Sequence, residues 1–279
     1  MKFIKMHGCG NDYIYVDCTK EDLVNESELS IKLSDRRFGI GSDGLILIRN
    51  SDVADFKMSI FNADGSEAKM CGNGVRCVGK FVYDNGLTDK EEVRIETLSG
   101  IKILKLNIRE GKVVTVEVDM GAPIVKAEMI PAISSKGSNE IIDEEINVDG
   151  VTYKVTCISM GNPHCVTFVD DTKILDLEKI GPGFERHKMF PDRVNTEFIQ
   201  VLSRNEINMR VWERGSGETF ACGTGACASV VACVLNGLTD DAVKVNLVGG
   251  ELFINYDRKA DTVFMTGPAT TVYSGEVEL

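Results

Sequence analysis

Apolar and polar residues alternate at every second position in two stretches of the chain, 55–61 and 206–212. A period of two is the pattern of a half-buried β-strand. Two later segments, 91–119 and 242–267, are also rich in strand-forming residues. The pattern therefore predicts two strand-rich regions of similar layout.

A helix is predicted inside each region. The first, at about 74–85, has one apolar face, formed by Val75, Val78, Phe81 and Val82. The second, at about 225–236, is apolar nearly all round, which is typical of a helix enclosed by a sheet or barrel. Each ends at an Asn-Gly pair, a common helix stop.

The two regions are copies of one unit. When the chain is shifted by 151 residues along itself, ten positions between Met58 and Asp89 match without a gap, whereas average composition gives about two by chance. The matches include Cys71-Gly72-Asn73-Gly74 on Cys222-Gly223-Thr224-Gly225. Convergent turn residues explain an Asn-Gly match but not all ten, so we infer a diverged duplication.

The predicted fold is α+β, with two pseudo-symmetric domains, each a mostly antiparallel sheet or barrel around one central helix. We expect the boundary near Gly121, which gives domains of 1–120 and 121–267. The segment 121–150 has no clear period, and its acidic run from Glu140 to Asp149 is predicted to be a solvated surface segment.

Composition narrows the classes of function. The 279 residues carry a formal charge of −12 and no basic block, which disfavours nucleic acid as a partner. No apolar run approaches the ~20 residues of a membrane span, and the first residues form no signal core, so we expect a cytoplasmic protein without membrane contact. Nine cysteines without a Cys-x-x-Cys and three separated histidines disfavour a structural zinc site.

Cys71 and Cys222 stand out because each precedes Gly-x-Gly at a predicted helix start. Unpaired N–H groups and the helix dipole stabilise an anion there, so we expect a lowered thiol pKa. One such cysteine could be a nucleophile, a redox sensor or a helix cap. Two in duplicated domains suggest thiols facing each other across an interdomain cleft. Inverting a carbon centre needs an acid and a base on opposite faces, which two thiols could supply.

Several longer motifs resemble the diaminopimelate epimerase family, and the resemblance runs from residue 1 to about 275. They are His7 to Asp12, Phe61 to Glu67, Cys71 to Cys77, Ser159 to Cys165, Glu213 to Thr219 and Ala221 to Cys227. The resemblance implies interconversion of LL- and meso-diaminopimelate, for lysine and peptidoglycan synthesis, with neither pyridoxal phosphate nor metal. It also implies that residues 268–279 return to the first domain, and a homodimer is expected.

The resemblance assigns roles by position. Cys71 and Cys222 become the two acid/base thiols, and His164 and Glu213 support catalysis. The implied substrate-binding residues are Asn11, Asn62, Gly72, Asn73, Asn162, Asn195, Glu213, Arg214, Gly223 and Thr224. Some members carry Gln where this chain has Gly44, so a side-chain contact from that position is not expected.

Other interpretations stay open at this point. His164 taken alone is more typical of a structural loop, and we expect the remaining seven cysteines to be buried and inert. Proline racemases and hydroxyproline epimerases share the paired-thiol mechanism, whereas phenazine-type isomerases share the fold without both cysteines. A redox switch or metal-binding module is disfavoured by the cysteine spacing.

Overall fold

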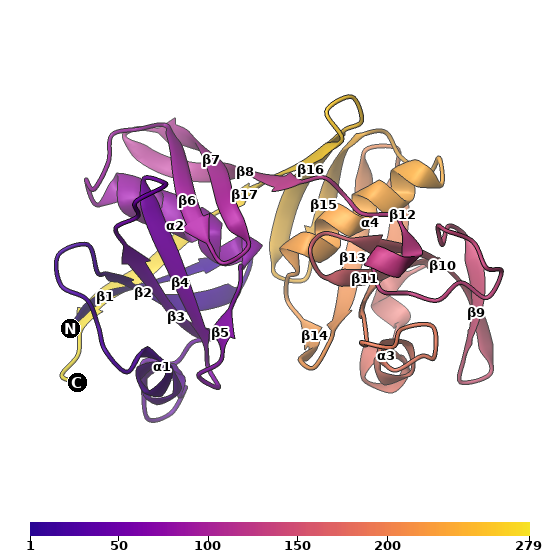
Figure 1. Ribbon diagram of the computed structural model, residues 1–279, viewed down its shortest axis with the longest axis horizontal. Helices are drawn as coiled ribbons and strands as arrows, with labels where there is room; N and C mark the ends of the chain where they lie inside the picture. The colour runs from indigo at the N-terminus through magenta and orange to yellow at the C-terminus, as the bar shows by residue number, and fades with distance from the viewer. The chain divides into compact units, whose positions relative to one another are not determined.

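The computed structural model describes residues 1–279, which divide into two compact units. The first contains Met1–Asp119 and Thr266–Leu279, and the second contains Met120–Met265. The N- and C-termini lie together in the first unit, where the Met1 amino group donates to the Val277 carbonyl at 2.7 Å (Figure 1).

The first unit is a mixed, mostly antiparallel sheet around one helix. Its elements are β1 (Lys2–Gly8), β2 (Asn11–Asp17), α1 (Glu26–Ser34), β3 (Gly44–Arg49), β4 (Phe56–Asn62), β5 (Glu67–Ala68), α2 (Gly72–Asp84), β6 (Glu92–Thr97), β7 (Gly100–Arg109), β8 (Lys112–Gly121) and β18 (Thr270–Glu276). Strands β2 and β3 are parallel, as are β4 and β6, whereas the pairs β1–β2, β3–β4, β6–β7 and β7–β8 are antiparallel. Helix α2 packs against β1, β2 and β7.

The second unit repeats this plan. Its elements are η1 (Ala127–Met129), β9 (Glu144–Val148), β10 (Val151–Ser159), β11 (Pro163–Phe168), η2 (Thr172–Ile174), α3 (Leu177–Glu185), β12 (Asn195–Ser203), β13 (Glu206–Glu213), β14 (Gly217–Thr219), α4 (Gly223–Leu235), β15 (Ala242–Leu247), β16 (Gly250–Asp257) and β17 (Thr262–Pro268). Strand β11 is parallel to β12, as β13 is to β15. Helix α4 packs against β10, β11, β12 and β16.

The structure confirms the duplication and the α+β class. Helices α2 and α4 have the same length and start 151 residues apart, as do α1 and α3. The register agrees too, because Ile14 pairs with Leu45 and the residues 151 positions later, Cys165 and Thr196, also pair. The outer strand comes from a different place in each copy: β18 pairs with β1, whereas β9 pairs with β10.

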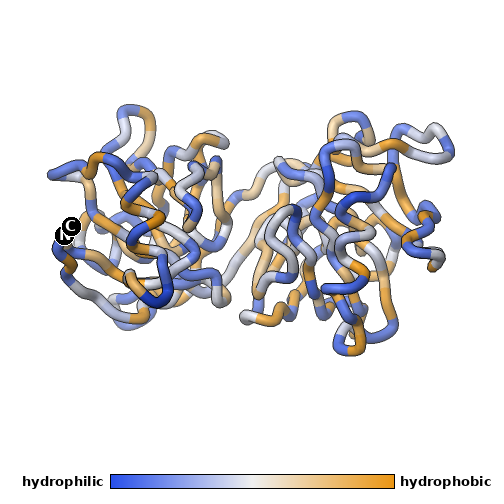
Figure 2. The backbone as a smooth tube through the Cα atoms, turned by 90° about the horizontal axis from the view of Figure 1, so that it is seen from below, coloured by the Kyte–Doolittle hydropathy of each residue, from blue (hydrophilic) through white to orange (hydrophobic).

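Both central helices are buried as their patterns predict. On α2, Val75, Val78, Phe81 and Val82 are at most 5% exposed, and α4 is buried along nearly its whole length. Hydrophobic and hydrophilic stretches follow one another along the backbone of both units (Figure 2). A helix held on several sides by strands has little freedom to shift, so the residues at its N-terminus are fixed in place.

The prediction for the acidic run from Glu140 to Asp149 was wrong. This run includes β9, in which Ile146 and Val148 are buried. Glu144 is 2% exposed and accepts hydrogen bonds from Ser134 and Ser135. The apolar alternation in β9 was masked by its acidic neighbours, and pairing with β10 turns one face of the strand inward.

Candidate active site

Cys71 is the N-cap of α2. Its backbone is extended, with φ −137° and ψ 116°, and its sulfur accepts a hydrogen bond from the Gly74 N–H at 3.3 Å. An N-cap side chain satisfies one of the N–H groups that have no partner within a helix. Gly72 and Asn73, the first two helical residues, are buried beside it.

Cys222 has the same geometry at the start of α4. Its sulfur accepts from the Gly225 N–H at 3.4 Å and lies 3.5 Å from the Thr224 hydroxyl. The two cysteines singled out by the sequence are thus equivalent in backbone conformation, capping bond and position in the repeat.

The thiol pKa expected for Cys222 was wrong in direction. Burial, followed by the negative charges of Glu213 and Glu197, raises the pKa of Cys222 well above its ordinary value. The helix N-terminus acts the other way, through the bond from Gly225, but it is outweighed. Desolvation disfavours a buried thiolate more strongly than one helix end stabilises it, so Cys222 is a neutral thiol at neutral pH.

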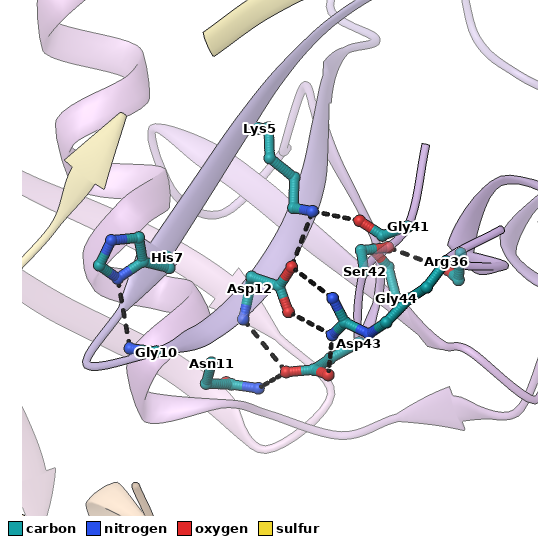
Figure 3. A network of polar contacts seen from close by, with 11 residues as sticks. Lys5, His7, Gly10, Asn11, Asp12, Arg36, Gly41, Ser42, Asp43 and Gly44 are labelled. Carbon is teal, nitrogen blue, oxygen red and sulfur yellow. Dashed lines mark hydrogen bonds and ion pairs between the residues drawn. The ribbon is translucent and has the colours of Figure 1, made fainter. Parts of the chain in front are cut away.

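Asn11 links Cys71 to a charged network in the first unit. The Asn11 amide nitrogen donates to Asp43 Oδ2 at 2.8 Å (Figure 3), and the Cys71 sulfur donates to Asn11 Oδ1 at 3.3 Å. The amide nitrogen of Asn73 also lies 3.5 Å from Asn11 Oδ1. Because an ionised carboxylate only accepts, Asp43 fixes the Asn11 amide with its carbonyl oxygen toward the thiol.

Asp43 is itself held by neighbouring charges. Arg36 bonds Asp43 at 2.9 Å and Asp12 at 2.7 Å, and Lys5 bonds Asp12 at 2.7 Å and the Gly41 carbonyl (Figure 3). Burial raises the pKa of Asp12, but the bonds from Arg36 and Lys5 outweigh it and leave that pKa below its ordinary value. Asp12 therefore stays ionised at neutral pH, and the network anchors Asn11.

In the second unit, His164 lies on a strand rather than in a loop. It is fully buried on β11, with Nδ1 2.7 Å from Glu197 Oε1 and Nε2 3.0 Å from Asn162 Oδ1. For both contacts to be hydrogen bonds, one proton must lie on Nε2 and a second between Nδ1 and the carboxyl oxygen. The Asn162 amide accordingly presents its nitrogen on the side away from His164.

Sequence analysis missed Glu197. Its side chain is fully buried on β12, and its second oxygen, Oε2, has no hydrogen-bond partner. A Cβ added at Gly225 would lie 2.5 Å from Glu197 Oε1, so the carboxyl group packs against the first turn of α4. One signal was available: the matching residue of the first copy, 151 positions earlier, is the apolar Ile46.

Glu213 and Arg214 follow one another at the end of β13 but differ in their surroundings. Glu213 accepts from the Thr219 hydroxyl at 2.5 Å, and burial followed by the charge of Glu197 raises the Glu213 pKa, with the Thr219 bond acting against them. Arg214 is exposed and donates to the Asp192 carbonyl at 3.0 Å.

The other expected amides are less closely tied to the cysteines. Asn195 is 4% exposed; it donates to the Pro163 carbonyl and accepts from the Arg214 N–H, so it fixes the backbone that carries Arg214. Asn62, at the end of β4, donates to the Ser66 hydroxyl at 3.0 Å. Asn11 therefore contacts Cys71 and Thr224 contacts Cys222, whereas Asn62 and Asn195 are held by other residues of their own units.

Gly44, at the start of β3, leaves no room for a side chain. A Cβ built there would lie 2.2 Å from the Phe61 carbonyl oxygen and 2.9 Å from the Tyr13 ring. The ring of Tyr13 occupies the space beside Gly44, so this position contributes no side chain to the site.

No cluster of three or more His, Cys, Asp or Glu side chains is arranged to hold a metal ion. None of the helices combines the length and the apolar character needed to span a membrane.

Solved structures with the same fold define the class of protein. A phenazine biosynthesis protein of the PhzF family from Bacillus anthracis superposes with a TM-score of 0.70 at 18% identity, covering 100% of this chain and 99% of its own. A hydroxyproline epimerase from Agrobacterium vitis, with bound trans-4-hydroxy-L-proline, also gives 0.70, at 14% identity and 99% and 90% coverage. At these identities the likeness is one of fold, a duplicated α+β protein.

Sequence comparison gives the family. The diaminopimelate epimerase family model matches residues 3–126 and 156–272. The diaminopimelate epimerases of Agathobacter rectalis and Methanococcus maripaludis are 58% and 56% identical to this chain, and each match covers 100% of both proteins. The chain belongs to the diaminopimelate epimerase family, as its motifs indicated.

Proposed function

We propose that this protein interconverts LL- and meso-diaminopimelate by moving the α-proton between Cys71 and Cys222. The observation that carries the proposal is the equivalence of these residues: each caps a central helix and accepts an N–H bond from the glycine three residues later. Two equivalent thiols in a duplicated protein suit a reaction that inverts one carbon centre.

In the proposed step, the thiolate of one cysteine takes the α-hydrogen as a proton, and the thiol of the other delivers a proton to the opposite face of the same carbon. The C–H electron pair passes into the adjacent carboxylate and returns when the new C–H bond forms. Because the pKa of Cys222 is raised, we assign Cys222 as the donor and Cys71 as the base of the resting protein.

The helix N-termini suit the charge that develops on the reacting carboxylate. Backbone N–H groups at Gly72-Asn73 and Gly223-Thr224 lie in the first turns of α2 and α4, where N–H donors and the helix dipole favour an anion. Donors held by a buried helix need no rearrangement during the reaction. No pyridoxal phosphate or metal takes part in this proposal.

The remaining polar residues suit the distal amino-acid group of the substrate. Arg214 is exposed and can bind a carboxylate in a bidentate manner, and Glu213 beside it can accept from an ammonium group. We assign Asn11, Asn62, Asn162 and Asn195 as the amides that bind or position the substrate. His164 and Glu213 support catalysis beside Cys222, because both lie close enough to influence its charge or that of its neighbours.

The test is hydrogen exchange at the α-carbon. Incubation with LL-diaminopimelate in deuterated water should give meso product with deuterium at one α-carbon, measured by NMR, and proline should not exchange. Cys71→Ala and Cys222→Ala should each abolish epimerisation. Cys233→Ala is the matched control, because this cysteine is also fully buried on α4 and lies about three helical turns beyond Cys222.

A finer test uses serine, whose hydroxyl can donate a proton but is a very poor base at neutral pH. On a diaminopimelate analogue with a β-leaving group, where one base suffices for elimination, Cys71→Ser and Cys222→Ser should process opposite enantiomers. If both variants process the same enantiomer equally, one thiol does not serve each face.

We further propose that the protein works in the cytoplasm, where thiols stay reduced. The family resemblance suggests a homodimer, which sedimentation equilibrium of the purified protein tests directly. A monomer at micromolar concentration with full exchange activity would contradict it.

A further inference from the structure

The turn that carries Arg214 joins β13 to β14 and is held by side chains from two other elements. The Arg214 N–H donates to Asn195 Oδ1 at 2.9 Å, and the next N–H along the chain, that of Gly215, donates to Glu185 Oε1 at 3.1 Å. Two successive backbone N–H groups of the turn are therefore fixed by side chains, one from β12 and one from α3.

Glu185 accepts hydrogen bonds with both of its carboxyl oxygens. It is the last residue of α3 and is 4% exposed. Its Oε2 accepts from the indole N–H of Trp212 at 2.8 Å, and its Oε1 also accepts from Arg193 at 3.2 Å. Because a carboxylate only accepts hydrogen bonds, it suits a position at which three N–H donors converge.

The packing around this carboxyl group leaves little room for movement. A Cβ added at Gly181, about one turn earlier on α3, would lie 2.3 Å from Trp212 Cδ2, so the helix and the indole ring are in direct contact. A Cβ at Gly217, the first residue of β14, would lie 3.6 Å from the same ring. Trp212 therefore joins α3 to both strands that flank the turn.

The first copy of the unit lacks this arrangement. At the position of Glu185 it has Ser34, and Phe61, which has no side-chain N–H, stands in place of Trp212. The carboxyl group and its indole donor are thus present only in the copy that carries Arg214. A carboxylate at the C-terminus of a helix is opposed by the helix dipole, so stabilisation of α3 does not explain this acid.

We propose that Glu185 is a positioning residue that determines substrate specificity by fixing the turn that carries Arg214. This proposal rests on the proposed function, in which Arg214 binds the distal carboxylate of diaminopimelate. A bidentate bond to a carboxylate requires the guanidinium group in one place and orientation. Asn195 and Glu185 fix the backbone from which the arginine extends, which reduces the conformational entropy lost when the substrate binds.

Glu185→Gln removes one acceptor and keeps the shape of the side chain. An amide has a single oxygen, so its nitrogen faces the N–H of either Trp212 or Gly215, and that hydrogen bond is lost. KM for diaminopimelate should rise about tenfold, the size expected for one hydrogen bond, while kcat stays within about threefold, because the reacting carbon is unaffected. Hydrogen–deuterium exchange of the peptide containing residues 213–217 should become faster. Trp212→Phe, which removes the indole donor, is the second variant and should raise KM about two- to fivefold.

Glu144→Gln is the matched control. Glu144 is also a buried carboxyl group of the second unit, and it holds a different loop by accepting from Ser134 and Ser135. This variant should lower Tm about as much as Glu185→Gln, but KM and the hydrogen exchange of residues 213–217 should stay at their wild-type values.

A double-mutant cycle separates positioning of Arg214 from a general loss of stability. In an Arg214→Ala background, Glu185→Gln should still lower Tm but should not raise KM further. The proposal is overturned if the two increases in KM multiply, or if hydrogen exchange of residues 213–217 is unchanged in Glu185→Gln. Failure of the proposed function has a different signature, because the wild-type protein would then not exchange the α-hydrogen of diaminopimelate. The hydrogen exchange of the turn would still decide whether Glu185 holds it.

Discussion

The most informative perturbation of the second site is a single methyl group on the helix turn beside Cys222. In Gly225→Ala, the new Cβ would lie 2.5 Å from Glu197 Oε1, 3.1 Å from Met209 Cε and 3.2 Å from Cys222 Cβ. The carboxyl group is fully buried and bonded to His164, so it cannot swing into solvent. Relief of the clash must therefore move Glu197 away from His164.

The magnitude follows from two opposing terms. Replacing Gly by Ala in a helix gains about 1 kcal/mol, whereas overpacking a buried site costs about 1–3 kcal/mol. We expect a net loss of at most about 2 kcal/mol and a fall in Tm of at most about 8 °C for a domain of this size. Gly74→Ala is the matched control, because its Cβ would first meet Ile46 Cδ1 at 2.8 Å, the mobile end of a flexible side chain.

The assay combines calorimetric melting with α-hydrogen exchange. Gly225→Ala should lower Tm and reduce kcat/KM at least tenfold, while Gly74→Ala should melt at or above the wild-type temperature. In a Glu197→Ala background the clash is gone, so adding Gly225→Ala should raise Tm instead of lowering it. An equal cost of Gly225→Ala in both backgrounds would refute the conclusion that Glu197 is fixed against the helix.

Three further changes test the surrounding groups. In Asp43→Asn, the partner of Asn11 can donate as well as accept, so the orientation of the Asn11 amide is no longer fixed. We therefore expect kcat to fall about five- to tenfold and Tm to stay within about 3 °C of wild type. Burial and the charge of Glu213 raise the pKa of Cys222, so Glu213→Gln should shift its alkylation profile to lower pH; a shift to higher pH would contradict this sign. Arg76 is fully buried, and its guanidinium group donates to the Gly72 carbonyl and to Asn73. Because a lysine cannot make both hydrogen bonds, Arg76→Lys should lower the free energy of unfolding by about 1.5–3 kcal/mol. An unchanged Tm would show that these hydrogen bonds are dispensable.

Local pattern in the sequence was enough to predict both helices and the duplication. Helix α2 was expected at 74–85 and occupies Gly72–Asp84, and α4 was expected at 225–236 and occupies Gly223–Leu235. The shift of 151 residues predicted the shared architecture, because a repeat and its periodicity are recorded position by position along the chain. The same shift singled out Cys71 and Cys222 as equivalent.

Contacts between residues on different strands could not be predicted from local sequence pattern. Nothing in the local sequence places Asp43 on Asn11 or Glu197 beside His164, because these contacts depend on parallel pairing between strands separated by about 30 residues. Strand β9 was missed for a related reason, since only its pairing with β10 gives it a buried face.

The protonation of the Cys222 thiol illustrates the difference between what the sequence determined and what the tertiary structure decided. The sequence determined that the cysteine precedes a helix, and a helix end is a local feature that favours the anion. Only the tertiary structure decided how deeply the sulfur is buried and that two carboxyl groups from other strands lie near it. Desolvation and like charge are set by the whole surrounding fold, and here they outweigh the helix and leave a protonated thiol.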